Sequence, residues 1–183
     1  MHVSIEPTRF VEPQVVASHF HIRPGEVVAD YGAGTGYFIP TLARATGPSG
    51  RVYACEIQKN LVQSLGDLIR TQHLDQVQVL WGDLEVEGGT KIPQGAVEVG
   101  ILVNTLFQLQ DKESAVAEIT RTLKPGARLY VIDWSESFGG LGPQPTDIVT
   151  QAAARALFET VGYTFERTFP AGEHHHGIMF RKS

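Results

Sequence analysis

Residues 27–38 read VVADYGAGTGYF. A short apolar run ends in Asp30, and Gly32, Gly34 and Gly36 then follow at every second position. This pattern predicts a strand, a tight turn and the start of a helix. Glycine tolerates positive φ and lets a ligand approach the backbone closely, and the first turn of a helix offers unpaired N–H groups to such a ligand. The segment therefore predicts a binding loop for a nucleotide-like molecule.

Strands and helices alternate outward from this loop. Apolar runs predict strands at about residues 26–31, 51–56, 77–81, 97–103, 128–133, 163–169 and 175–182. Helical spacing of apolar residues predicts helices at about residues 12–20, 36–46, 58–71, 111–123 and 146–161. Such alternation is typical of a parallel sheet that is covered by helices on both faces.

The expected fold class is therefore α/β, with a Rossmann-like, doubly wound sheet of seven strands. The sheet is mostly parallel, and the last two strands form an antiparallel hairpin around residues 170–173. Residues 84–95 are expected to form an exposed loop. Gly100 lies inside a predicted strand, where it either weakens the strand or permits a close approach.

The chain of 183 residues is expected to form one domain. Within it we expect an N-terminal lid and helix (1–23), a cofactor-binding core (24–134) and an acceptor-side loop, helix and hairpin (135–183). The net charge of −5 gives no footprint for nucleic acid, and the single cysteine excludes an intramolecular disulfide. No apolar run is long enough for a membrane span, and no signal peptide is recognisable, so a cytoplasmic protein is expected.

Four polar side chains follow predicted strands, namely Asp30, Glu56, Asp83 and Asn104. In open α/β sheets, ligands bind beyond the carboxyl ends of the strands, so these side chains are expected to converge on one site. In Rossmann-type sites an acid at the end of the second strand accepts hydrogen bonds from ribose hydroxyls, which fits Glu56. The alternatives are local: a solvated Glu56, a turn capped by Asp83 and a helix capped by Asn104.

The glycine spacing distinguishes between two cofactors. The dinucleotide fingerprint is G-x-G-x-x-G, and its backbone binds a pyrophosphate. Here the spacing is G-x-G-x-G, with Asp30 two residues before the first glycine. An acid at that position repels a pyrophosphate but attracts an ammonium group. S-adenosylmethionine (SAM) carries an amino group, a sulfonium and no phosphate, so the loop suits SAM better than NAD.

Five sequence blocks carry a resemblance to a known family. They are ADYGAGTGYF (29–38), YACEIQ (53–58), WGDLE (81–85), VEVGILVNTLFQL (97–109) and LKPGARLYVIDW (123–134). In these blocks the chain resembles the class I SAM-dependent methyltransferases, close to the methyltransferase type 11 and ubiquinone/menaquinone methyltransferase-like group. Glu98 departs from the aspartate that is usual in the family at the head of the fourth strand.

The resemblance implies that SAM is the methyl donor and S-adenosylhomocysteine (SAH) the product. It implies that Asp30 orients the methionyl amino group, Glu56 binds the ribose, Asp83 accepts from the adenine amine and Asn104 lies near the sulfonium. The full set of implied cofactor-binding residues is Asp30, Gly32, Ala33, Gly34, Gly36, Glu56, Ile57, Asp83, Leu84 and Asn104.

Methyl transfer from a sulfonium needs positioning above all, and a general base only where the acceptor must lose a proton. The candidate catalytic residues are Asp133, His174 and His176. Asp133 is equally suited to capping a loop, and the neighbouring Trp134 to the core or a lid. Within the run HHH at 174–176 only the outer two histidines share a face of a strand, and no metal site is expected.

Little of the chain is left to form a lid, so the acceptor is either small and covered by the N-terminal segment and residues 135–146, or large and docked on an open face. A small molecule is the expected acceptor. Residues 104–107 read NTLF and lack the two prolines of the motif with which amino-methylating enzymes of nucleic-acid bases clamp their substrate. Dimerisation is one way in which the site could be closed. The alternative functions are a non-catalytic SAM-binding regulator and an NAD-binding oxidoreductase.

Overall fold

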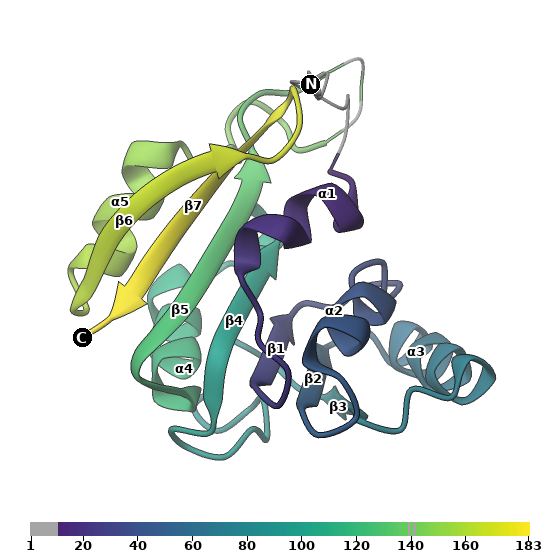
Figure 1. Cartoon of the computed structure of the whole chain (residues 1–183). Coiled ribbons are helices and arrows are strands. Elements are labelled where there is room, and N and C mark those ends of the chain that lie inside the picture. Colours follow the sequence, from purple (N-terminus) through teal and green to yellow (C-terminus); the bar gives the residue numbers. More distant parts are fainter. Residues whose placement is uncertain (1–10, 139, 141) are drawn as a thin grey trace, which may run out of the picture.

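In this computed structural model, residues 11–138, 140 and 142–183 are described. They contain one seven-stranded sheet (Figure 1). Its strands are β1 (Val27–Tyr31), β2 (Arg51–Glu56), β3 (Val77–Trp81), β4 (Val97–Val103), β5 (Leu123–Trp134), β6 (Tyr163–Pro170) and β7 (His175–Lys182). The helices are α1 (Pro13–Ala17), α2 (Ile39–Thr46), α3 (Lys59–Gln72), α4 (Lys112–Thr122) and α5 (Gln151–Glu159), with short 3-10 turns η1 (Ser18–Phe20) and η2 (Leu106–Gln108).

The strand order is β3-β2-β1-β4-β5-β7-β6. The first five strands run parallel, whereas β7 is antiparallel to both β5 and β6. The chain moves outward from β1 to β3 and then crosses back to β4, so the order reverses between β1 and β4. Ligands of open α/β sheets bind at such a switch point. The predicted fold class is confirmed.

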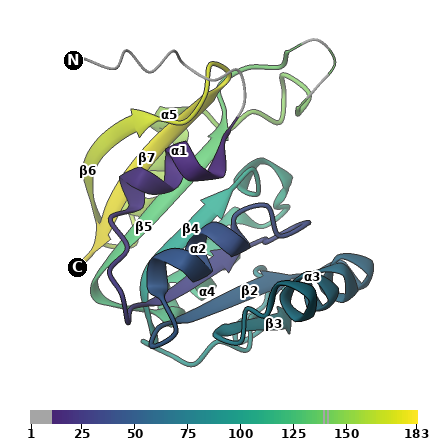
Figure 2. The same ribbon diagram turned by 45° about the vertical axis from the view of Figure 1, so that its right-hand side comes forward.

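Each face of the sheet has its own apolar core. Val28 and Ile101 pack with α1, α2 and α3 on one face, and Ala29 and Leu102 pack with α4 and α5 on the other. Successive strand residues point to opposite faces, so these strands read as continuous apolar runs. Figure 2 shows α3 beside β2 and β3 at one end of the sheet and α5 beside β6 at the other.

Gly100 permits a close approach, and this resolves the alternative left open by the sequence. A Cβ at Gly100 would lie 2.9 Å from Cε2 of Tyr31 and 3.0 Å from Cδ1 of Leu129. The Tyr31 ring is fully buried, and its hydroxyl is 2.5 Å from Oγ1 of Thr122 in α4. The glycine therefore provides the space for a core tyrosine.

The starts of β5 and α5 differ most from the prediction. β5 begins at Leu123, because Leu123 pairs with Val97 before the ladder shifts register between Val97 and Val99. The expected turn at 124–126 thus lies within β5. α5 begins only at Gln151, where Thr150 caps it by accepting a hydrogen bond from the Ala153 N–H. That cap defines the start of the helix more sharply than the apolar pattern does.

The segment between β3 and β4 is less exposed than predicted. Thr90 and Ile92 are buried there, because the segment is hydrogen-bonded to Glu118 of α4. The Glu118 carboxylate accepts hydrogen bonds from Gly88 N, from Thr90 N and Oγ1, and from the Arg121 guanidinium. A polar side chain on a core-facing helix thus orders a loop that its Gly-rich composition had marked as exposed.

Candidate functional site

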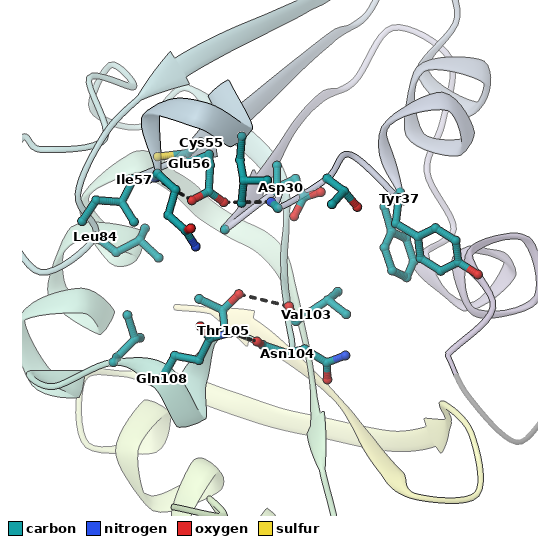
Figure 3. Close-up of a pocket in the computed structure, with 18 of the residues that line it drawn as sticks. Asp30, Tyr37, Cys55, Glu56, Ile57, Leu84, Val103, Asn104, Thr105 and Gln108 are labelled. Carbon is teal, nitrogen blue, oxygen red and sulfur yellow. Dashed lines mark hydrogen bonds between the residues drawn. The ribbon is translucent and has the colours of Figure 1, made fainter. Parts of the chain in front are cut away.

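A cavity of about 630 Å³ opens at the carboxyl ends of the strands around the switch point between β1 and β4 (Figure 3). Its volume lies within the range of small-molecule sites, about 300–1,000 Å³. The predicted cofactor residues that line it are Asp30, Gly32, Ala33, Gly34, Glu56, Ile57, Asp83, Leu84 and Asn104. The sheet topology has therefore brought together residues from four strand ends.

The glycine loop follows β1, and its three glycines have positive φ angles of 89°, 56° and 83°. Gly34 has open space where a Cβ would lie, on the side of the cavity. At Gly36, by contrast, a Cβ would lie 2.7 Å from methyl groups of Leu65 and Leu68 in α3. Gly36 is not among the residues that line the cavity, and it lets the loop pack against α3; its expected ligand contact stays a prediction.

Asp30 is a buried acid in the cavity with a strongly raised pKa. It is 3% exposed, and none of the described residues donates a hydrogen bond to its carboxylate. Burial, together with the nearby charge of Glu56, raises the pKa of Asp30 from 3.8 to about 7. A buried carboxylate without a partner is costly, and a cation placed beside it would offset that cost.

Glu56 connects β2 to the glycine loop. Its Oε2 accepts from Gly34 N at 2.9 Å and its Oε1 accepts from Gln58 N at 2.8 Å. Glu56 is buried rather than solvated, whereas the next residue, Ile57, is exposed. Each carboxylate oxygen keeps a second lone pair, so the side chain can hold the loop and still accept hydroxyl groups from a ligand.

Asp83 has the capping role that was considered as an alternative to ligand binding, whereas Asn104 does not. Oδ1 of Asp83 accepts from Glu85 N at 2.8 Å, so Asp83 caps its turn while lining the cavity. Asn104 makes no side-chain cap to η2. Its φ is 51°, a conformation that asparagine tolerates better than most residues. Its Oδ1 is buried with no hydrogen-bond partner in the described part of the chain.

The catalytic candidates that the sequence suggested do not line the cavity. The Asp133 carboxylate accepts from the backbone N–H groups of Phe107 (3.1 Å) and Trp134 (2.8 Å), which is the loop-capping role. Burial nevertheless raises the pKa of Asp133 to about 6. Nδ1 of His174 lies 2.9 Å from Oε1 of Glu136, and Nε2 of His176 lies 3.0 Å from the Val149 carbonyl.

The histidine that lines the cavity is His175, beside Trp134. The alternation along the strand was predicted correctly, because His174 and His176 do share a face, but that face lies away from the cavity. The distinguishing signal is the antiparallel register, in which His175 pairs with Trp134. That register depends on contacts far apart in sequence. Across residues 11–138, 140 and 142–183, no cluster of three or more His, Cys, Asp or Glu side chains has a metal-binding arrangement.

Comparison with known proteins assigns this chain to a family. The model of a family described as "Methyltransferase domain" matches residues 29–131, more than half of the chain. The chain belongs to this family. The match contains the four predicted strand ends with Asp30, Glu56, Asp83 and Asn104, whereas Trp134 and His175 lie beyond it.

Curated relatives match in the same region. A ubiquinone/menaquinone biosynthesis C-methyltransferase of Burkholderia mallei (strain SAVP1) is 31% identical over 116 residues, which are 63% of this chain and 46% of the relative. An uncharacterized 37.1 kDa protein in transposon TN4556 of Streptomyces fradiae is 34% identical over 114 residues, 61% of this chain and 32% of that protein. The chain thus spans less than half the length of these two relatives.

A solved structure agrees over nearly the whole chain. The SAM-dependent methyltransferase of Aquifex aeolicus superposes with a TM-score of 0.87 at 24% identity, covering 96% of this chain and 92% of that one. At this identity the likeness shows the fold. No helix among the described residues of this methyltransferase-family chain combines the length and apolar character that crossing a membrane requires.

Proposed function

We propose that this protein transfers a methyl group from SAM to a small-molecule acceptor. The observation that carries the proposal is the buried carboxylate of Asp30 at the end of β1, which has no hydrogen-bond partner among the described residues and lines a cavity of about 630 Å³. The amino group of SAM is a cation of the kind that such a carboxylate needs. The pyrophosphate of NAD is an anion, and a carboxylate in that position would repel it.

The remaining strand ends fit the other parts of SAM. Glu56 lies one strand away from Asp30 and has lone pairs left for the ribose hydroxyls. Leu84 is a buried apolar residue beside Asp83 and provides an apolar contact for adenine. The side-chain amide oxygen Oδ1 of Asn104, across the β1–β4 switch point, has no partner in the described structure. The residues present therefore fit the group.

Bound in this cavity, SAM would supply a methyl group on a positively charged sulfur. The contribution of the chain is to hold the donor and to exclude water around the reacting atoms. Asp30 holds the ammonium end, Glu56 holds the ribose, and the loop around Gly34 keeps the backbone clear between them. Asp30 has to be deprotonated to hold the ammonium group, and the other contacts act by positioning the donor.

The proposal is tested by calorimetry with SAM, SAH and NAD in separate titrations. We expect SAM and SAH to bind and NAD not to bind. Incubation with labelled SAM and the small-molecule fraction of a cell extract then tests transfer, with mass spectrometry of the labelled product. NAD binding without SAH binding would refute the proposal. Binding of SAH without any labelled product would instead favour a regulator.

A further inference from the structure

The cavity has two halves that come from different parts of the sheet. Asp30, Glu56 and Asp83 follow β1, β2 and β3 on one side of the switch point. The opposite half is formed where β4 and β5 end beside the start of β7. Asn104 N donates to the Ile132 carbonyl of β5 at 2.8 Å, and Trp134 at the end of β5 pairs with His175 at the start of β7. This second half carries no acid in the cavity lining.

His175 is the polar group of that second half. Its ring packs against Trp134 in a tilted arrangement, with a centroid distance of 4.3 Å and an angle of 40° between the planes. The residue is 7% exposed and lines the cavity. Both ring nitrogens are buried, and neither has a hydrogen-bond partner in the described structure. Buried polar groups without partners are rare in folded proteins and call for an explanation.

The two neighbouring histidines show what a structural role looks like in this strand. His174 interacts with Glu136 and stacks on Phe138, and His176 contacts the Val149 carbonyl. His175 has no corresponding contact through its nitrogens, although it is about as well buried as His174. The packing on Trp134 fixes the ring plane, so one of the two nitrogens is available to a molecule in the cavity.

We propose that His175 is the general base for the acceptor, and that the acceptor is a small molecule with an acidic hydroxyl of the phenol class. This inference rests on the function proposed above. Burial and the neighbouring histidines lower the pKa of His175 to about 4, so its ring is neutral at pH 7 and is a weaker base than an ordinary imidazole. A weak base removes a proton more readily from a phenol, with a pKa of about 10, than from an alkyl alcohol.

The reaction balances as follows. The O–H bond of the acceptor breaks, its proton moves to a ring nitrogen of His175, and the bonding pair stays on oxygen. That oxygen forms a bond to the methyl carbon, and the electron pair of the sulfur–methyl bond returns to sulfur. The positive charge of the sulfonium disappears while the imidazolium gains one, and the imidazolium later releases its proton to water.

The first test measures binding with two probes whose oxygen carries either a proton or a methyl group. 2-Naphthol and 2-methoxynaphthalene are titrated into protein saturated with SAH. We expect wild-type protein to bind 2-naphthol at least about tenfold more tightly than the ether, because only the naphthol donates a hydrogen bond. The preference should vanish in His175→Phe, which keeps a ring against Trp134, and persist in His174→Gln. NMR of the wild-type histidine rings should show one imidazole responding to the naphthol and not to the ether.

The second test measures transfer of labelled methyl groups from SAM to 2-naphthol. His175→Gln should lower the rate by about 100-fold or more, the usual contribution of a general base, while its SAH affinity stays within about twofold of wild type. The inference would be overturned if His175→Gln kept a rate within threefold of wild type, or if wild-type protein bound the two probes equally. It would also be overturned if wild-type protein that binds SAH neither bound nor methylated naphthol. If wild-type protein did not bind SAH at all, the proposed function itself would be refuted.

Discussion

Two buried polar clusters, one anchored on α4 and one at the carboxyl ends of the strands, differ in how many of their hydrogen bonds are made. In the Glu118 cluster (Glu118, Arg121, Thr90 and the Gly88 N–H) both carboxylate oxygens are bonded. In the cavity cluster (Asp30, Asn104 and His175) the described structure leaves the carboxylate, the amide oxygen and both imidazole nitrogens without partners. The first arrangement stabilises a loop, and the second keeps bonding capacity for a ligand.

The pKa values show the same contrast. Burial would raise the pKa of Glu118, but hydrogen bonds from Arg121, Thr90 and the backbone outweigh it and lower the pKa to about 2. Burial and Glu56 raise the pKa of Asp30 to about 7, with no hydrogen bond to oppose them. One carboxylate is therefore stabilised by the fold as an anion, and the other is not. Substitutions in the two clusters should have opposite consequences for stability and binding.

The largest expected effect is on stability, in Glu118→Ala. Removing one partner of a buried, bonded network leaves Arg121 and Thr90 unpaired, so we expect a loss of about 3 kcal/mol in the free energy of unfolding. Urea denaturation measures it. SAH affinity should stay within about twofold of wild type when the protein is folded. A loss below about 1 kcal/mol would contradict the assignment of a stabilising network.

The next effect is on binding, in Asp30→Asn. Loss of the negative charge should weaken SAM and SAH binding by about 10- to 100-fold, the equivalent of about 1–3 kcal/mol. Asp67→Asn is the matched control, because Asp67 is an exposed acid on α3 outside the cavity. Calorimetry of both variants gives the comparison. Equal affinities for wild type and Asp30→Asn would remove the basis for an ammonium site.

The same variant should also change how stability depends on pH. The pKa of Asp30 is higher in the folded protein (about 7) than its ordinary value of 3.8, so ligand-free protein loses stability as pH rises through that interval. Asp30→Asn removes this loss and should be more stable than wild type at pH 8, by a margin that shrinks toward pH 4. Unfolding curves at the two pH values measure it, and a margin independent of pH would contradict the raised pKa.

A smaller effect is expected for Asn104→Gly. Glycine accepts the φ of 51° and keeps the backbone groups, so the unfolding free energy should change by less than about 1 kcal/mol. SAH affinity should fall by about fivefold to tenfold, because the amide group is lost from the cavity. If stability fell while affinity did not, Asn104 would belong with the structural cluster instead.

The smallest effect is expected at an exposed ion pair, Arg155–Glu159 on α5. Exposed pairs at i,i+4 contribute about 0.3–0.5 kcal/mol, so Glu159→Gln should lower stability by no more than that. Melting curves at low and high salt check it, since salt should abolish the difference. A loss of stability comparable to that of Glu118→Ala would contradict the small contribution that is expected of an exposed ion pair. The number of hydrogen bonds made by a buried group would then no longer explain the difference between the two clusters.

Much of the fold followed from local patterns. The bounds of β2, β3, β4 and β7 agree with the predicted runs, because apolar residues there are bounded by turn residues. The start of β5 could not be predicted in this way, since a Lys-Pro-Gly sequence reads as a turn and pairs with β4 only through contacts distant in sequence. The buried segment around Thr90 was also missed, because its partner Glu118 lies 28 residues away.

The sequence by itself determined the alternation of elements, the polar strand ends and the glycine loop, because each depends on neighbours along the chain. Only the tertiary structure decided which of three consecutive histidines faces the cavity, that Gly36 packs against α3, and that Asp133 holds backbone N–H groups. A shift of one residue in strand register moves every side chain to the other face. That register is fixed by the pairing of β7 with β5, and with it the position of His175 beside Trp134.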